Sequence, residues 1–172
     1  MKSLRLVLLT TALAMTAGAV AGCGAKKKEI SELKRKEAAH LASEAQFSIT
    51  MRNWAEAEAG LTKAVAACPD VGAYWVSLGS IRIKLGNKGG AKDAYKGALA
   101  AYQDEAEKDK ADPGPWLQQV YVLALLGRVD DARSLLDKTV KKFPEQRVVK
   151  RFIEGKEFDR MLTDPKFKDN AL

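Results

Sequence analysis

Histidine and cysteine are scarce in this chain of 172 residues, and both shortages restrict the chemistry that it can perform. The single histidine, His40, has no cysteine, aspartate or second histidine at the spacing of a metal site, which argues against a zinc centre. The sequence contains no Gly-x-Ser-x-Gly motif and no glycine-rich phosphate loop. Its carboxylates form no pair that stands out from ordinary helix-surface charge. We therefore expect no enzyme activity and no metal.

Apolar runs long enough to cross a membrane are also missing. Lys2 and Arg5 precede an apolar stretch at 6–15, and small residues follow it. A spanning helix needs roughly 20 apolar residues, so this stretch is too short to cross a bilayer. A basic start, a short apolar run and a small-residue end are typical of a secretory signal peptide. We expect residues 1–22 to be removed.

Residues 20–23 read Val-Ala-Gly-Cys, which resembles the lipobox of bacterial lipoproteins. The resemblance implies cleavage before Cys23 and acylation of its thiol, so the expected cofactor is none beyond a covalent lipid. Two or three acyl chains anchor a protein stably, whereas one does so marginally. Gly24 stands where enterobacterial lipoproteins of the inner membrane commonly carry Asp, which implies the outer membrane, facing the periplasm, if the organism has one. The alternative is a secreted protein with a free cysteine.

The charge balance is basic, with 29 lysines and arginines against 22 acidic residues and a formal net charge of +7. Because Lys2 and Arg5 are the charged residues of 1–22, removing that segment lowers the net charge to about +5. Three lysines in the tether at 23–29 suit anionic headgroups, each contributing about 1 kcal/mol near such a surface. A solvated tether is the alternative. No segment resembles a nucleic-acid module, so we expect no nucleic-acid partner.

The one other cysteine, Cys68, directly precedes Pro69 at the end of an alanine-rich segment. A mature chain with this single free thiol cannot form an internal disulfide. Cysteine is among the most buried residue types, so we expect Cys68 to be a small core residue and not a reactive thiol.

One spaced pattern of small and apolar residues occurs three times. It starts at Ala57, Ala91 and Ala132, which lie 34 and 41 residues apart. The residues between 30 and 49 also show helical spacing of apolar positions. Self-similarity at this period predicts stacked helix pairs in place of a single closed core.

The second unit resembles the tetratricopeptide repeat. It has an aromatic residue, Leu-Gly, a Gly-Asn turn, then Ala, an aromatic residue and Ala, and the residues concerned are Trp75, Leu78, Gly79, Gly86, Asn87, Ala91, Tyr95 and Ala98. The third unit matches in Trp116, Gly127, Ala132, Leu136 and Pro144. It departs from the family at 119–120, where Gln-Val replaces Leu-Gly. The resemblance, over about 38–146, implies an all-α tetratricopeptide-repeat solenoid.

We expect about three helix-turn-helix pairs within 30–146, at about 38–71, 72–112 and 113–146, followed by a helical cap at 147–172. The 41-residue interval contains seven extra residues, which is about two helical turns, and predicts a longer second helix in the middle pair. The residues expected on its buried face are Tyr95, Ala98, Tyr102 and Ala106. The residues expected to cover the last pair are Phe158, Leu162 and Phe167.

In the family that the chain resembles, the first helices line a concave groove that receives a peptide or helix. The groove candidates are Gln46, Ile49, Thr50, Val76, Ser80, Ile83, Lys84, Leu117, Tyr121, Ala124 and Leu125. They are mostly apolar or aromatic, which suits a hydrophobic segment. The positions of a carboxylate-clamping lysine hold other residues, which argues against that type of clamp. The alternative is that several candidates only pack against neighbouring helices.

Together these patterns predict a membrane-tethered adaptor or scaffold in the bacterial cell envelope, which binds a protein partner through its groove. One alternative is a structural spacer that associates with its own copies. Another is an accessory subunit of an envelope enzyme, such as a cell-wall hydrolase.

Overall fold

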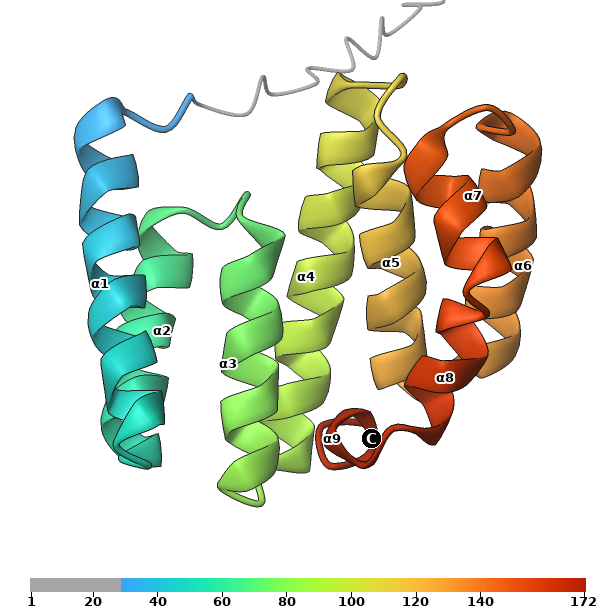
Figure 1. The fold of residues 1–172 in the computed structure, drawn as a ribbon. Helices are drawn as coiled ribbons and strands as arrows, with labels where there is room; N and C mark the ends of the chain where they lie inside the picture. Colours follow the sequence, from blue (N-terminus) through green and yellow to red (C-terminus); the bar gives the residue numbers. More distant parts are fainter. Residues whose placement is uncertain (1–28) are drawn as a thin grey trace, which may run out of the picture.

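The computed structural model describes residues 29–172, and every regular element in that range is a helix (Figure 1). The expected signal peptide, Cys23 and all but the last residue of the expected tether lie outside the described residues. In chain order the helices are α1 (Glu32–Thr50), α2 (Trp54–Ala67), α3 (Gly72–Lys84), α4 (Lys88–Lys108), α5 (Gly114–Leu125), α6 (Val129–Lys142), α7 (Arg147–Glu154), α8 (Glu157–Thr163) and α9 (Pro165–Lys168).

The first six helices form three pairs, α1 with α2, α3 with α4 and α5 with α6, which stack side by side (Figure 1). The turn inside each pair has the same hydrogen bond, in which an amide donates to the carbonyl five residues earlier. The N···O distances are 2.8 Å for Asn53 to Ser48, 2.8 Å for Asn87 to Arg82 and 2.9 Å for Arg128 to Leu123. This bond defines a Schellman motif and requires a left-handed residue beside it. The all-α solenoid of helix pairs is therefore confirmed.

The left-handed residue differs between the turns. Gly86 has φ of 75° and Gly127 has φ of 73°, as glycine readily allows. In the first pair, Arg52 occupies the same place with φ of 58°. A side chain in this conformation costs roughly 1–2 kcal/mol. The first turn is thus made with a less suitable residue than the other two.

Small residues permit the close approach of helices within the middle pair. The ring of Tyr95 on α4 lies directly against Gly79 on α3, so that a Cβ at Gly79 would overlap the ring. A Cβ at Gly97 would lie only 2.8 Å from the Trp75 ring. These two aromatic residues fill the space between helices where glycine leaves room.

Helix α4 has 21 residues, whereas α2 and α6 have 14 each. The difference equals the seven extra residues of the sequence interval, and it confirms the predicted lengthening. The four residues expected on the buried face, Tyr95, Ala98, Tyr102 and Ala106, are all buried.

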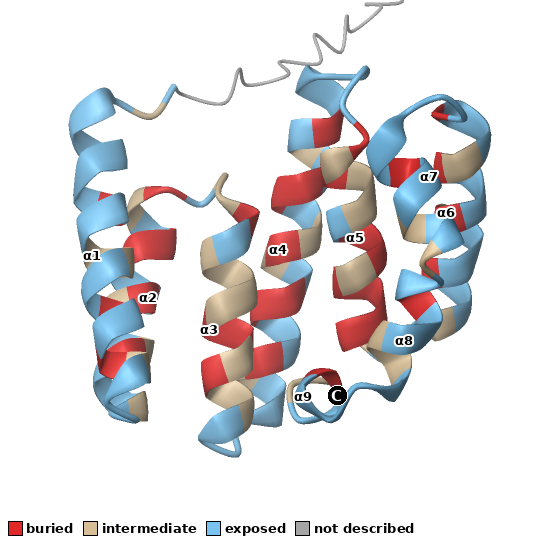
Figure 2. Ribbon diagram, in the orientation of Figure 1, coloured by how far each residue is buried: buried red, intermediate tan, exposed pale blue. Residues whose placement is uncertain are grey.

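Buried residues are concentrated along α4 and α5, and α1 is mostly exposed (Figure 2). Helices α7 and α8 lie against the last pair. Phe158 of α8 is buried, and the Arg133 guanidinium of α6 lies 5.0 Å from the centre of its ring. Arg133 also donates to Asp159 at 2.9 Å. Helix α9 lies apart, below α5 and near the lower ends of α3 and α4 (Figure 1).

Candidate functional site

The groove candidates come from the first helix of each pair. Gln46, Ile49 and Thr50 lie at the end of α1, the next four candidates lie on α3, and the last four lie on α5. Their exposure is uneven, because some of these positions face the neighbouring helices. Gln46 and Thr50 are exposed, whereas Ile49 packs against the core of the first two pairs.

On α3 and α5, the structure separates candidates that a ligand can reach from those that it cannot. Lys84 is exposed, and the four candidates Val76, Ser80, Ile83 and Tyr121 are half-buried, as is Leu117. Ala124 and Leu125 are buried, and Leu125 has no exposed surface. Their side chains belong to a core cluster that also contains Phe167, so in this structure they are covered and do not line an open groove.

The chain itself covers part of the expected groove. We call residues 164–172, which include α9, the closing segment. Its Phe167 lies edge-on against Tyr121, with ring centres 5.8 Å apart. Phe167 therefore covers part of the last pair, as the sequence predicted, and it does so at a groove candidate on α5.

Three polar contacts connect the closing segment to α3, α4 and α5. The Tyr95 hydroxyl donates to the Asn170 carbonyl at 2.6 Å, and its oxygen lies 3.5 Å from the Ser80 hydroxyl. The Leu172 amide donates to the Leu125 carbonyl at 2.9 Å. The Lys84 ammonium lies 3.6 Å from the Asp169 carboxylate. The segment therefore touches candidates on both α3 and α5.

Burial further favours the neutral form of two tyrosines near this contact. Burial raises the pKa of Tyr95 and the pKa of Tyr121 above their ordinary value. A neutral phenol can donate a hydrogen bond, whereas a phenolate cannot. Tyr95 is thus kept as a donor facing the Asn170 carbonyl.

Comparisons with known proteins identify no family and no function for the chain. No protein-family model matches the chain, and no curated protein matches it. Among solved structures, the tetratricopeptide-repeat domain of Arabidopsis OM64 is similar, with a TM-score of 0.43 and 12% identity over 74% of this chain and 98% of that one. The fold assignment rests on the helix pairs and their shared turns.

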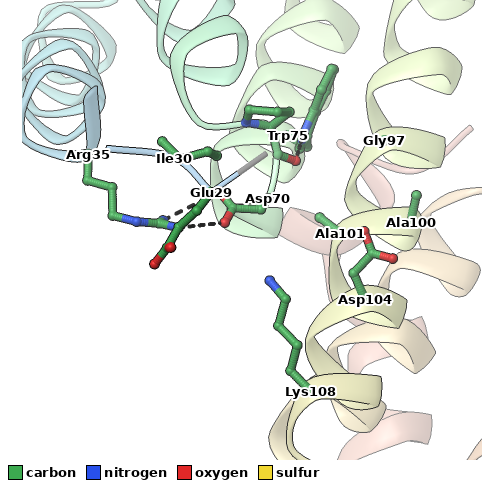
Figure 3. Close-up of a pocket in the computed structure, with 11 residues that line it drawn as sticks. Glu29, Ile30, Arg35, Asp70, Trp75, Gly97, Ala100, Ala101, Asp104 and Lys108 are labelled. Atoms are coloured by element: carbon green, nitrogen blue, oxygen red, sulfur yellow. Dashed lines mark hydrogen bonds and ion pairs between the residues drawn. The ribbon is translucent and has the colours of Figure 1, made fainter. Parts of the chain in front are cut away.

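Apart from the groove, a hollow of about 720 Å³ lies between the start of α1 and the long helix α4 (Figure 3). Arg35 and Asp70 stand on one side of it, Ala101 and Lys108 on the other, and Trp75 at its back. The Trp75 indole donates to the Pro69 carbonyl at 2.9 Å, which holds the ring in place. No sequence motif marked this hollow, because its walls come from three segments that are distant in the chain.

An ion pair closes one side of that hollow. The Arg35 guanidinium donates to the Asp70 carboxylate at 2.8 Å. Partial burial opposes ionisation of Asp70, but the hydrogen bond and charge of Arg35 outweigh it and hold the pKa of Asp70 below its ordinary value. The pair therefore links α1 to the connection between α2 and α3.

Cys68 and His40 do not form a reactive centre. Cys68 is buried with its sulfur 3.5 Å from the Lys34 carbonyl, and burial raises the pKa of its thiol. His40 is exposed and lies 3.4 Å from Glu44. In residues 29–172, no group of three or more histidine, cysteine or carboxylate side chains is placed to hold a metal ion. Over the same residues, no helix is long and apolar enough to span a bilayer.

The departure at 119–120 places a polar residue, Gln119, in the core. Gln119 stands where the family pattern has Leu, and its side-chain amide donates to the Tyr102 carbonyl at 3.3 Å. Its neighbour Val120 is also buried. The departure from the family at 119–120 is therefore accommodated by a hydrogen bond between α5 and α4. A glutamine at a core-facing position was the available signal.

Proposed function

We propose that this chain is an adaptor or scaffold, tethered to a membrane of the bacterial cell envelope, which binds a peptide or helix of a protein partner in the groove along α1, α3 and α5. The observation that carries this proposal is the seating of the chain's own closing segment on α3 and α5. Main-chain groups of the closing segment bond to the Tyr95 hydroxyl and the Leu125 carbonyl there. A surface that holds one peptide segment in this way has the chemistry to hold another.

The tether is the second part of the proposal. It rests on the sequence at 20–23, through lipid on Cys23, and we propose an outer-membrane location facing the periplasm where the organism has one. The first described helix begins at Glu32, only nine residues after Cys23. Nine extended residues reach at most about 30 Å, so the groove would work close to the membrane surface.

Photo-crosslinking in cells tests the groove directly. A photoreactive residue is placed at Gln46 or Thr50, which are exposed on α1, and crosslinked proteins are identified by mass spectrometry. The matched control carries the same residue at Lys92, which is exposed on the second helix of the middle pair. We expect one partner to be enriched from the α1 positions and not from Lys92. Equal recovery from all three positions would contradict a binding groove.

Metabolic labelling tests the tether, and the crosslinking experiment also tests the alternative of self-association. Metabolic labelling with a fatty-acid analogue should mark the wild-type chain and not the Cys23→Ser variant. Crosslinks from Gln46 to a second copy of this chain would favour the structural spacer over the adaptor.

A further inference from the structure

The closing segment, residues 164–172, is held in a manner unlike the rest of the cap. Helices α7 and α8 pack against the last pair through Val149 and Phe158, which are both buried. The closing segment has one large buried side chain, Phe167, and its lysines at 166 and 168 are exposed. Its helix α9 has four residues, too few to be stable alone. The segment is therefore attached through a few contacts along the groove.

Those contacts fall into a pattern that another peptide can reproduce. Two of them use main-chain atoms of the segment, at Asn170 and Leu172, and these make no demand on side-chain identity. Ala171 also packs against the core, but a small apolar residue is a weak requirement. Two contacts depend more strongly on the side chain. They are the aromatic ring of Phe167 against Tyr121 and the carboxylate of Asp169 near Lys84.

The site beneath the segment needs an occupant. Tyr95 is fully buried, and its hydroxyl donates to the carbonyl of Asn170 at 2.6 Å. Leaving a buried hydroxyl without a partner costs about 1–3 kcal/mol. A peptide that replaces the closing segment would restore this hydrogen bond if it supplied a carbonyl at the same point.

The site is also open to solvent beside the segment. A hollow of about 470 Å³ adjoins Phe167, with Tyr121, Arg160 and Asn170 among its lining residues. An incoming chain can therefore approach Tyr121 before Phe167 has left. Asp164 and Pro165, which begin the segment, are both exposed, and Asp164 is the residue that joins α8 to α9.

We infer that the groove between α3 and α5 binds a partner segment built like the closing segment, with an aromatic side chain for Tyr121 and a carboxylate two residues later for Lys84. The closing segment occupies this site in the free protein, and the partner displaces it. The inference rests on the proposed function, because it names the class of segment that the groove accepts. Because the closing segment competes for the groove, partner binding is weaker than it would be to an empty groove, since only the open fraction of molecules can bind.

The test uses the full chain in detergent and a fluorescein-labelled synthetic peptide of residues 164–172. Fluorescence anisotropy measures binding to the wild type and to Phe167→Ala, in which the anchor of the closing segment is removed. We expect the variant to bind the peptide about tenfold more tightly than the wild type, as a site that is open about a tenth of the time would require. A peptide with alanine at the position of Phe167 should bind neither chain.

Two further variants guard against a folding artefact. Asp169→Lys keeps Phe167 but reverses the charge facing Lys84, and it should raise peptide affinity about two- to fivefold, as expected for a surface ion pair. Lys168→Ala changes an exposed neighbour with no contact to the groove and should leave affinity unchanged. Circular dichroism on each variant should give the helical signal of the wild type.

Each other outcome overturns the inference. Equal affinity of wild type and Phe167→Ala would show that the closing segment does not compete. Absence of binding to every variant would show that the groove does not accept this class of segment, whereas the crosslinking from Gln46 and Thr50 on α1 would still decide the proposed function. Dimers that light scattering detects and that the peptide dissociates would identify a second copy of this chain as the occupant.

Discussion

The two ends of the helix stack are built differently. At the first pair, α1 buries Ala38, Ala45 and Ser48, while its larger residue Phe47 is 69% exposed. At the last pair, α7 and α8 lie over α6, and Phe158 is only 4% exposed. Apolar area removed from water contributes about 25 cal/mol per Å², so the end that buries aromatic rings gains more than the end that buries alanines.

From this difference in burial we expect repeats with the same turns to differ in stability. The pairs share a turn hydrogen bond and a helix arrangement, yet each depends on what its neighbour covers. In a stack of repeats, stability is approximately a sum of repeat and interface contributions. The first pair has one neighbouring pair, and the last has a neighbouring pair and two capping helices. We therefore expect α1 to exchange its amide hydrogens faster than α5.

The largest expected effect comes from matched truncations at the two ends. Phe158→Ala removes a buried ring and should lower the free energy of unfolding by about 3–5 kcal/mol. Phe47→Ala removes an exposed ring and should change it by about 0.5 kcal/mol or less. Urea unfolding followed by circular dichroism measures both. Similar losses for the two variants would mean that the ends are equally covered.

The next effect concerns close helix packing. Gly79→Ala forces the Tyr95 ring to move and should destabilise the chain by about 1–3 kcal/mol, because overpacking distorts the middle pair. Gly60 in the first pair is the matched position, where a new Cβ would meet Ala45 Cβ at 3.1 Å.

Alanine also gains roughly 0.5–1 kcal/mol over glycine in a helix, so Gly60→Ala should be close to neutral. Thermal unfolding compares the two variants. A loss at Gly60 as large as that at Gly79 would show that the first pair is packed as rigidly as the middle pair.

The turn of the first pair offers a substitution that should raise the free energy of unfolding and not lower it. Arg52→Gly relieves a left-handed side-chain conformation and should stabilise the chain by about 1 kcal/mol. Gly86→Ala, in the equivalent turn of the middle pair, should destabilise it by a similar amount. The midpoint of urea unfolding reports both shifts, and no change in either variant would contradict the assigned role of these turns.

The smallest expected effect on stability comes from the ion pair of Arg35 and Asp70, which lies at the first helix pair. Arg35 lowers the pKa of Asp70, so the carboxylate is more acidic in the folded chain than in the unfolded one. Its contribution is therefore full above the pKa of an unfolded aspartate, about 3.9, and disappears as the pH falls through the folded pKa. For a partly exposed pair we expect about 0.2–1 kcal/mol.

The measurement is the unfolding free energy of wild type and Asp70→Asn between pH 6 and pH 3. The difference between the two should shrink as the pH falls. A constant difference would show that Asp70 acts through packing and not through its charge.

Much of the fold followed from local patterns. The 41-residue interval predicted a longer second helix, and α4 has that length because whole turns keep Tyr95 and Tyr102 on one face. Gly86 predicted a left-handed turn because glycine lacks the Cβ that disfavours it. Arg52 carried no such signal, since an arginine in this conformation is imposed by the helices on either side.

The binding surface was predicted less completely. Helical spacing assigned the candidates to the right helices, but a face that lines a groove and a face that packs on a neighbouring pair have the same period. Leu125 was assigned to the groove and lies in a core cluster to which α4, α6 and Phe167 of the closing segment all contribute. The hollow beside Trp75 could not be predicted, since three distant segments form it.

Sequence alone determined the all-α repeat architecture, the longer second helix of the middle pair and the positions of the turns within the pairs, because helix period, glycine and proline act within a few residues. Tertiary structure decided which apolar positions remain accessible and where residues 164–172 lie. A short segment with one aromatic residue has no periodicity to predict its location. Phe167 lies against Tyr121 because the stacking of α3 and α5 creates a surface where its ring, Asn170 and Leu172 all find partners at once.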